Sequence, residues 1–323
     1  MAELTYIRAL NRALADEMRR DPRVMVLGED VAEGGPYGAT RDLAEEFGER
    51  RVRNTPISEA TVTGIAIGAA LSGWRPVVEI MFIDFITLAL DQLVNQAAKA
   101  RYMSGGQLRV PLVLRTQGGA GARSGAQHSQ SLEAWLVHVP GLKVVMPSTP
   151  ADAAGLLQAA IRDDDPVVVV EHKTLYYRKG EVPDDALVPL GRAAVRRSGR
   201  DVTIVATSRM VDEALTAAET LAAEGIEAEV IDPRTLQPLD VDTLVASVAR
   251  TGRCVVAHEA VTTGGFGAEV ASLVQQEALD RLEAPVLRVG APFAPVPASP
   301  PLEDTYLVGA AQIADAVRRA MAW

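Results

Sequence analysis

Short apolar runs alternate along the chain with segments in which apolar residues recur at helical spacing, such as 88–103 and 151–162. Strands that alternate with helices favour parallel pairing, with helices on both faces of the sheet. The pattern therefore predicts an α/β fold. The strands expected in the first half of the chain are 24–27, 77–80, 110–115, 143–146 and 166–171.

The alternation stops between residues 173 and 200, where glycines and prolines interrupt a stretch of mixed charge, as is typical of a connection between domains. We expect a first domain over 1–180, a linker over 181–200 and a smaller α/β domain over 201–323. The proline-rich stretch 291–301 should be largely extended. The second domain's expected strands are 202–206, 228–231, 254–257 and 286–289, and its expected helices are 211–223, 241–249, 266–278 and 312–321.

Composition excludes several classes of partner. The 323 residues carry a formal net charge of −10, which gives no electrostatic attraction toward nucleic acid or an anionic membrane. The most apolar stretch, 60–71, is far shorter than the ~20 residues that span a bilayer, so it predicts a buried helix. Cys254 is the only cysteine and lies in an apolar run, and the N-terminus lacks the apolar centre of a secretion signal. We expect a cytoplasmic protein.

Glu59 is the most informative titratable residue because it leads into that helix with almost nothing polar to pair with. A carboxylate that loses solvation holds its proton more tightly and can act as an acid near neutral pH. A glutamate stabilised by the helix dipole explains the same spacing.

Gly64 and Gly68, one helical turn apart, give this helix a face with almost no side chain, suited to close backbone contact within the chain or with a second chain.

A glycine-rich loop, 117–130, follows one of the predicted strands and contains His128. Because α/β proteins place their sites at the carboxyl ends of parallel strands, His128 is a candidate for proton transfer. The loop matches a dinucleotide fingerprint poorly, since the third glycine and a following helix are missing. We interpret His138, His172 and His258 as packing or hydrogen-bonding residues.

Taken together, several motifs resemble the beta subunit of the E1 component of 2-oxoacid dehydrogenase complexes, over the whole chain. The resemblance implies a thiamin-diphosphate pyrimidine-binding fold followed by a transketolase C-terminal-like fold. The motifs are Asn54-Thr55-Pro56-Ile57-Ser58-Glu59, Phe82-Ile83-Asp84-Phe85, Asp91-Gln92, Asn95-Gln96-Ala97-Ala98-Lys99, Tyr102-Met103-Ser104-Gly105-Gly106, Gln127-His128-Ser129-Gln130, Pro140-Gly141-Leu142-Lys143-Val144-Val145, His258-Glu259-Ala260 and 263–269.

The resemblance assigns roles to individual residues. In the family, the glutamate matching Glu59 protonates N1′ of the thiamin aminopyrimidine, and an apolar shell would keep that proton in place. Phe85 matches the aromatic residue that packs on this ring, and Ile57 and Met81 match positions that line its pocket. His128 matches the active-site histidine associated with the 2-oxoacid intermediate and with reductive acyl transfer to the lipoyl group.

The resemblance also implies partners. Thiamin enzymes hold the diphosphate through Mg²⁺ and a Gly-Asp-Gly motif, which occurs nowhere in this sequence. An alpha subunit is therefore expected to hold Mg²⁺ and to share the cofactor in an α2β2 tetramer. The E2 acyltransferase is expected to bind through its subunit-binding and lipoyl domains, the former on the C-terminal domain. Related beta subunits hold a potassium ion, matching here Leu112, Ala160, Ile161, Asp163 and Asp165.

The expected reaction is decarboxylation of a 2-oxoacid and reductive acylation of the E2 lipoyl group. Pyruvate is the first substrate hypothesis and a branched-chain 2-oxoacid the second, while acetoin cleavage is a close rival because 4–6, 81–85 and 171–176 resemble acetoin dehydrogenase beta chains. A nicotinamide-binding oxidoreductase and a non-catalytic scaffold that docks E2 are the alternatives from other classes.

Overall fold

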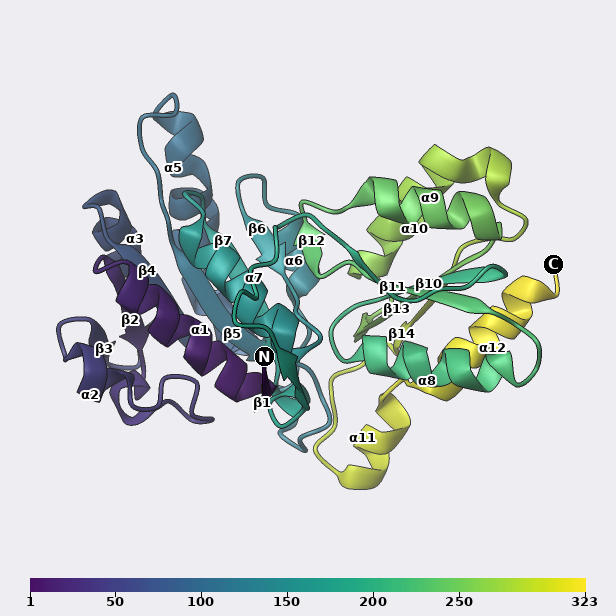
Figure 1. Cartoon of the computed structure of the whole chain (residues 1–323), viewed down its shortest axis with the longest axis horizontal. Helices are drawn as coiled ribbons and strands as arrows, with labels where there is room; N and C mark the ends of the chain where they lie inside the picture. The colour runs from purple at the N-terminus through teal and green to yellow at the C-terminus, as the bar shows by residue number, and fades with distance from the viewer. The chain divides into compact units, whose positions relative to one another are not determined.

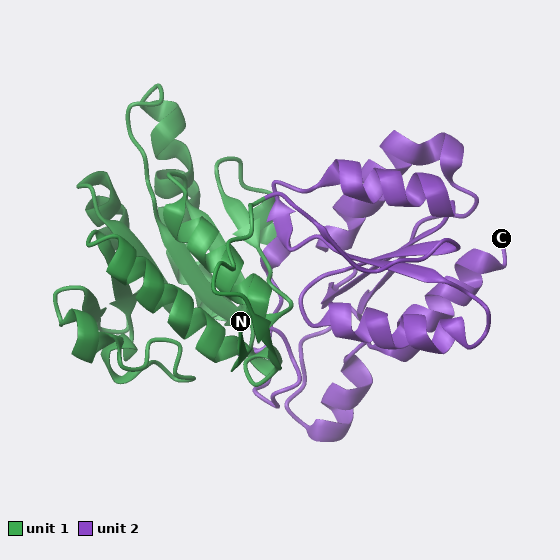
Figure 2. Ribbon diagram, in the orientation of Figure 1, with its two compact units in different colours: residues 1–118, 135–190 green, residues 119–134, 191–323 purple.

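The computed structural model describes all residues from Met1 to Trp323 and divides the chain into two compact units (Figure 2). Unit 1 comprises residues 1–118 and 135–190, and unit 2 comprises residues 119–134 and 191–323. The change from unit 1 to unit 2 after Leu190 falls inside the predicted 181–200 connection. The grouping of 119–134 with the C-terminal half was not indicated by the sequence pattern.

Unit 1 is built on a parallel sheet with strand order β6-β7-β5-β4-β2-β3. Five of these strands are mostly apolar, which explains why the sequence pattern located them, whereas β3 has two exposed polar residues and was missed. The strands are β2 (Val24–Gly28), β3 (Val52–Asn54), β4 (Arg75–Phe82), β5 (Val113–Gly118), β6 (Lys143–Val145) and β7 (Val167–His172).

Helices cover both faces of this sheet (Figure 1). The buried sides of α1 (Tyr6–Arg20) and α7 (Pro150–Arg162) share one core with alternate residues of the strands, such as Val24 and Val26. Successive strand residues point to opposite faces, so the remaining strand residues lie on the side of α3 (Glu59–Leu71), which packs on β4. The shorter elements are η1 (Val31–Glu33), α2 (Leu43–Phe47), η2 (Ile83–Phe85), α4 (Ile86–Asp91), the π-helical η3 (Gln92–Ala97), α5 (Ala98–Met103), α6 (Glu133–Val137), which begins in unit 2, and η4 (Lys173–Leu175).

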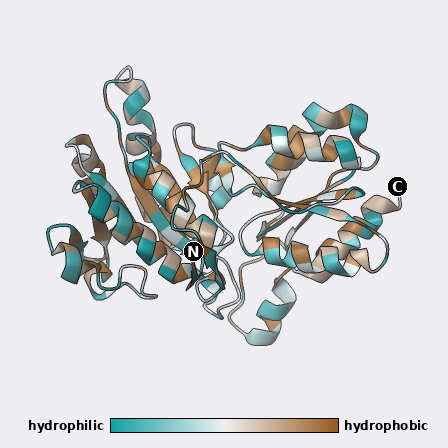
Figure 3. Cartoon of the chain, in the orientation of Figure 1, coloured by the Kyte–Doolittle hydropathy of each residue, from teal (hydrophilic) through white to brown (hydrophobic).

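Unit 2 contains a second sheet with strand order β14-β13-β10-β11-β9, in which only β9 runs antiparallel. One face carries α8 and α12 and the other carries α9 and α10 (Figure 1), and the central strands are buried and mainly hydrophobic (Figure 3). The elements are β9 (Ala194–Arg197), β10 (Val202–Ala206), α8 (Met210–Ala222), β11 (Ala228–Asp232), β12 (Thr235–Gln237), α9 (Val241–Thr251), β13 (Cys254–Val261), α10 (Phe266–Ala278), η5 (Leu279–Arg281), β14 (Leu287–Ala291), α11 (Pro300–Tyr306) and α12 (Ala310–Met321).

The structure differs from the sequence prediction at the edges of both units. Residues expected to be irregular contain β8 (Lys179–Val182), which pairs antiparallel with β1 (Ala2–Thr5), and β9. The stretch expected to be extended contains the start of α11, because Pro300 occupies the first helical turn, where its missing N–H leaves no hydrogen bond unmade. None of the helices is both long enough and apolar enough to cross a lipid bilayer.

Candidate functional site

Glu59 is the first residue of α3 and lies at the carboxyl edge of the unit 1 sheet. Thr55 N–H donates to the carbonyl of Gly28 over 2.9 Å, which holds the segment before Glu59 beside the end of β2. The side chain is half-buried, whereas the sequence predicted a buried carboxylate. The positive end of the helix dipole favours an acidic side chain at this position.

A second carboxylate, Glu29, lies near Glu59. Glu29 directly follows β2, and β2 pairs with β4 so that Gly28 faces Glu79. Burial raises the pKa of Glu29, and the charges of Asp30 and Glu59 raise it further. Two acidic groups therefore share one edge of the sheet, which the sequence analysis missed because it singled out only the glutamate at the helix start.

The apolar residues assigned to the cofactor pocket lie around the end of β4. Met81 and Phe85 are half-buried, and Ile57 is 74% exposed. Phe85 meets the ring of Phe82 edge-on, with the ring centroids 6.1 Å apart, and the Lys173 ammonium lies 5.4 Å from the centroid of Phe82. The aromatic group is thus supported from within unit 1 while Ile57 remains exposed to solvent.

The two glycines of α3 have different surroundings. A Cβ atom on Gly64 would lie 3.3 Å from Oε1 of Gln92, so this glycine faces a neighbouring helix of its own chain. A Cβ atom on Gly68 would have nothing within 4 Å. Nearby Ile65 is 59% exposed. Only the Gly68 side of the helix therefore leaves room for a second chain.

His128 belongs to unit 2, in the loop segment 119–134 that precedes α6. Its side chain is half-buried and its backbone N–H donates to the Gly125 carbonyl over 3.3 Å. His128 and the Glu59 group therefore belong to different units of the chain.

His172 and His258 are buried, as expected of packing or hydrogen-bonding residues, whereas His138 is not. His138 is exposed, and Nδ1 of His172 accepts from Thr174 N–H over 3.2 Å. Burial lowers the pKa of His258 from 6.5 to about 4, which keeps the ring neutral. Burial also raises the pKa of the Cys254 thiol to about 12, as expected for an inert packing residue.

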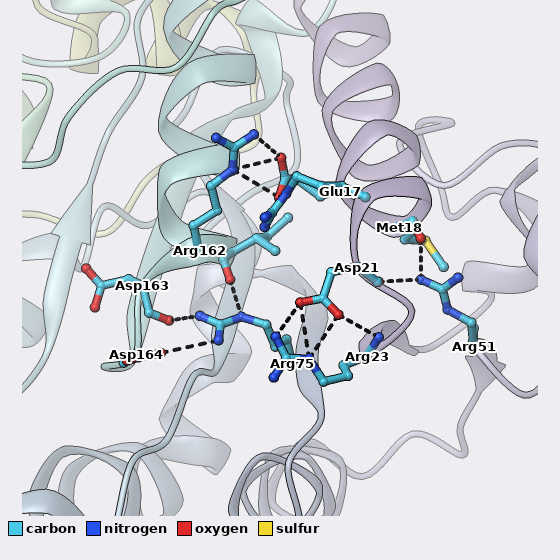
Figure 4. A network of polar contacts seen from close by, with 11 residues as sticks. Glu17, Met18, Asp21, Arg23, Arg51, Arg75, Arg162, Asp163 and Asp164 are labelled. Atoms are coloured by element: carbon cyan, nitrogen blue, oxygen red, sulfur yellow. Dashed lines mark hydrogen bonds and ion pairs between the residues drawn. The ribbon is translucent and has the colours of Figure 1, made fainter.

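Oxygens of the predicted potassium ligands already accept hydrogen bonds or contact cationic side chains, and Figure 4 shows Arg75 beside Asp163 near the end of α7. The Arg75 guanidinium donates to the carbonyls of Ile161, over 2.8 Å, and Asp163, over 2.5 Å. The Lys143 ammonium lies 2.7 Å from the Asp163 carboxylate. Leu112 O accepts from Val167 N–H over 2.9 Å, Ala160 O accepts from Asp163 N–H over 3.2 Å, and Asp165 pairs with Arg101 over 2.7 Å.

A buried ion network lies at the centre of the unit 1 sheet. Arg115 is 2% exposed and contacts Glu171 over 2.7 Å and Glu79 over 2.7 Å, and the Tyr176 hydroxyl donates to Glu171 over 2.7 Å. Buried charges require such pairing. The network joins β4, β5 and β7 and the residue that follows η4, and so fixes β4, the strand that contains Met81.

Unit 2 contains several buried carboxylates that the sequence did not single out as site residues, among them Glu133, Glu259 and Glu303. The last two bind the segment that carries His128. Residues so far apart in sequence leave no local pattern, and only the fold brings them together.

Two parallel sheets joined by a short connection, with a carboxylate and an aromatic group at the edge of the first, define a transketolase-like protein. The family described as "Transketolase, pyrimidine binding domain" matches residues 2–179, and "Transketolase, C-terminal domain" matches residues 191–313. The solved structure titled "Split gene transketolase, inactive beta4 tetramer" has a TM-score of 0.83 and 26% identity, and the match covers 99% of this chain and 98% of that one.

More similar relatives narrow the class. The beta subunit of acetoin:2,6-dichlorophenolindophenol oxidoreductase from Cupriavidus necator is 50% identical, over 97% of this chain and 96% of the relative. Pyruvate dehydrogenase E1 component subunit beta from Rhizobium meliloti is 47% identical, over 98% of this chain and 70% of the relative. The 2-oxoisovalerate dehydrogenase subunit beta from Bacillus subtilis is 44% identical, over 98% of this chain and 98% of the relative. The chain belongs to this family of E1 beta subunits of 2-oxoacid and acetoin dehydrogenases.

Proposed function

We propose that the chain is the beta subunit of a thiamin-diphosphate-dependent E1 enzyme that acts together with an alpha subunit. The observation that carries this proposal is the position of Glu59, at the start of a helix in a pyrimidine-binding domain and near Glu29. The fold and the family membership are compatible with this role, and a nicotinamide enzyme is disfavoured by the match to two transketolase domains.

The side chains at this edge suit an aminopyrimidine ring. Phe85, Met81 and Ile57 offer apolar surface for its faces, and Glu59 offers a carboxyl group for a ring nitrogen. Bound thiamin diphosphate would supply a carbon nucleophile at C2 of its thiazolium. Glu59 would hold a proton at N1′ of the ring, and covering its exposed side by a partner would strengthen that proton's binding.

The alpha subunit would supply Mg²⁺ and the diphosphate site, because Gly-Asp-Gly does not occur in these 323 residues. Exposed apolar groups around Gly68 and Ile57 suit a contact with another chain, since large apolar patches mark interfaces. We further propose that the C-terminal domain docks the subunit-binding domain of an E2 acyltransferase and that its lipoyl domain receives the acyl group, in the cytoplasm.

The potassium ion also stays a proposal. Carbonyl oxygens have two lone pairs, so the oxygens of Ile161 and Asp163 can accept from Arg75 and still contact an ion. Leu112, Ala160 and Asp165 complete the proposed set.

Pyruvate is the proposed substrate, a branched-chain 2-oxoacid is the second, and acetoin is the specific alternative. The identities of 50%, 47% and 44% for the acetoin, pyruvate and 2-oxoisovalerate relatives are too close to rank these substrates. Turnover of pyruvate, 2-oxoisovalerate and acetoin by the assembled complex, measured with an artificial electron acceptor, separates them. Preference for acetoin would reject the pyruvate proposal.

The role of Glu59 is tested by Glu59→Gln in the same assay. We expect kcat to fall by roughly 100-fold or more, since general acid–base groups contribute factors of this size. Glu45→Gln, which changes an exposed glutamate of α2, is the matched control and should keep full turnover. Unchanged activity in an intact Glu59→Gln complex would support the non-catalytic scaffold instead.

A further inference from the structure

The segment 119–134 has little structure of its own to hold His128 in place. It forms no strand, and its only helical residues are the first two of α6. The φ angles of Gly119, Gly121, Arg123 and Gly125 are 86°, 94°, 59° and 73°, a sequence of left-handed residues that makes the backbone turn repeatedly. A conformation of this kind persists only where other groups hold it.

Two buried carboxylates of unit 2 provide that support by accepting hydrogen bonds from consecutive backbone amides. Ala120 N–H donates to Glu259 Oε1 over 2.6 Å. Gly121 N–H donates to Glu303 Oε1 over 2.8 Å, and Arg123 N–H donates to Glu303 Oε2 over 3.2 Å. Hydrogen bonds to an ionised acceptor are roughly twice as strong as neutral ones.

Both carboxylates are themselves fixed by arginines. Glu303 is fully buried and lies 2.8 Å from the Arg123 guanidinium, which also contacts Asp304 over 2.6 Å. Glu259 is 9% exposed and accepts from Arg209 Nε over 2.6 Å. A buried carboxylate needs such donors to stay ionised, so the amides and arginines form one mutually dependent network.

Side-chain packing adds one small apolar cluster, in which Ala120 packs with Ala291, Val296 and Tyr306. A cavity of about 390 Å³ separates the segment from part of unit 2. Loop residues from Ala120 to Leu132 line one side, and Glu259, Val261, Val296 and Tyr306 are among those that line the other. On the side preceding His128, the segment is therefore attached by the two carboxylates together with the Ala120 cluster and the contacts of the Arg123 guanidinium.

We propose that Glu303 and Glu259 are positioning residues for His128, which assigns the C-terminal unit a part in the reaction. The inference rests on the proposed function, in which His128 acts on the acyl group. Loss of either carboxylate would leave the His128 side chain intact but free to sample wrong positions, and small misplacements of a catalytic group slow reactions strongly.

Hydrogen exchange tests the anchoring without any activity. In Glu303→Gln we expect the amides of Gly121 and Arg123 to exchange at least about tenfold faster than in the wild type, because one neutral carbonyl oxygen replaces the two carboxylate oxygens that accept from them. Glu224→Gln, which also removes an arginine-paired glutamate of unit 2, is the matched control and should leave these amides protected. Unchanged exchange in both Glu303→Gln and Glu303→Ala would overturn the anchoring.

Kinetics test the positioning in the assembled complex, with free lipoamide as acyl acceptor. We expect Glu303→Gln to lower kcat about tenfold and Glu303→Asp to recover part of it, with the KM for thiamin diphosphate unchanged. In a His128→Ala background the same substitution should have no further effect, because residues that act through one group are not additive. An equal loss in both backgrounds refutes the positioning role. Absence of thiamin-dependent turnover in the wild type refutes the proposed function, while the exchange experiment still decides the anchoring.

Discussion

Replacing Glu133 with glutamine should stabilise the chain at alkaline pH and have little effect near pH 5. Glu133 is 2% exposed, and its Oε2 has no hydrogen-bond partner. Burial raises its pKa from 4.5 to about 7, its own backbone N–H opposes this shift, and the nearby Glu259 carboxylate adds to it. At neutral pH the group is thus partly protonated in the folded chain but ionised in the unfolded one.

The sign and size follow from proton linkage. The folded state binds this proton more tightly, so the contribution to stability is complete below about pH 4.5, falls between 4.5 and 7, and is lost above 7. Each pKa unit between the two states is worth about 1.4 kcal/mol, which gives a loss on the order of 3 kcal/mol. Glutamine cannot ionise, so the variant avoids this loss.

The assay is urea unfolding followed by circular dichroism at about pH 5 and about pH 8.5, at one chain concentration because assembly makes stability concentration-dependent. The stability difference between Glu133→Gln and wild type should grow by roughly 3 kcal/mol from the lower to the higher pH. Glu277→Gln on α10, which changes an exposed glutamate, should show no such growth. A constant difference for Glu133→Gln would refute the linkage argument.

Two further substitutions test the core and the interface. In a denaturation experiment, Arg115→Met should lower the free energy of unfolding by roughly 3–5 kcal/mol, because Glu171 and Glu79 remain buried without their cation. Adding Glu171→Met should recover part of this loss. Gly68→Leu should leave the isolated chain folded, since its Cβ has open space, yet weaken assembly with the alpha subunit at least about tenfold by sedimentation. Normal assembly would place the alpha interface elsewhere.

The sequence predicted the central elements well because their burial leaves a clear periodic pattern. Helix α10 begins at Phe266 and ends at Ala278, as predicted, and β10 coincides with 202–206. Short edge strands such as β1 and β8 carry polar residues and pair over a long sequence distance, so no local pattern marks them. In the proline-rich stretch, the pattern of prolines was correct evidence for a break but gave no sign that Pro300 begins a helix.

The residues of the candidate site could be predicted only where they lie in a motif of consecutive residues. Glu59 and His128 lie in compact motifs that a sequence displays directly. Glu29 became visible through the pairing of β2 with β4, and Glu303 through a contact that spans about 180 residues, since it binds Gly121. Such partners depend on tertiary packing, which a single sequence does not display.

Glu133, Glu259 and Glu303, three of the buried carboxylates of unit 2, differ in their hydrogen-bond donors. Glu303 and Glu259 each have an arginine and at least one backbone amide to hold their negative charge, whereas the Oε2 atom of Glu133 has no donor. The neutral form of Glu133 therefore spares Glu259 a repulsive neighbour, and its ionisation as the pH rises through about 7 weakens the group that holds the His128 segment. Above this pH, amide hydrogen exchange at residues 120–124 of the wild type should therefore be faster than the pH dependence of the intrinsic exchange rate explains. Glu133→Gln should remove this additional increase in the exchange rate. The stability and exchange experiments thus test the interaction between Glu133 and Glu259 by two independent measurements.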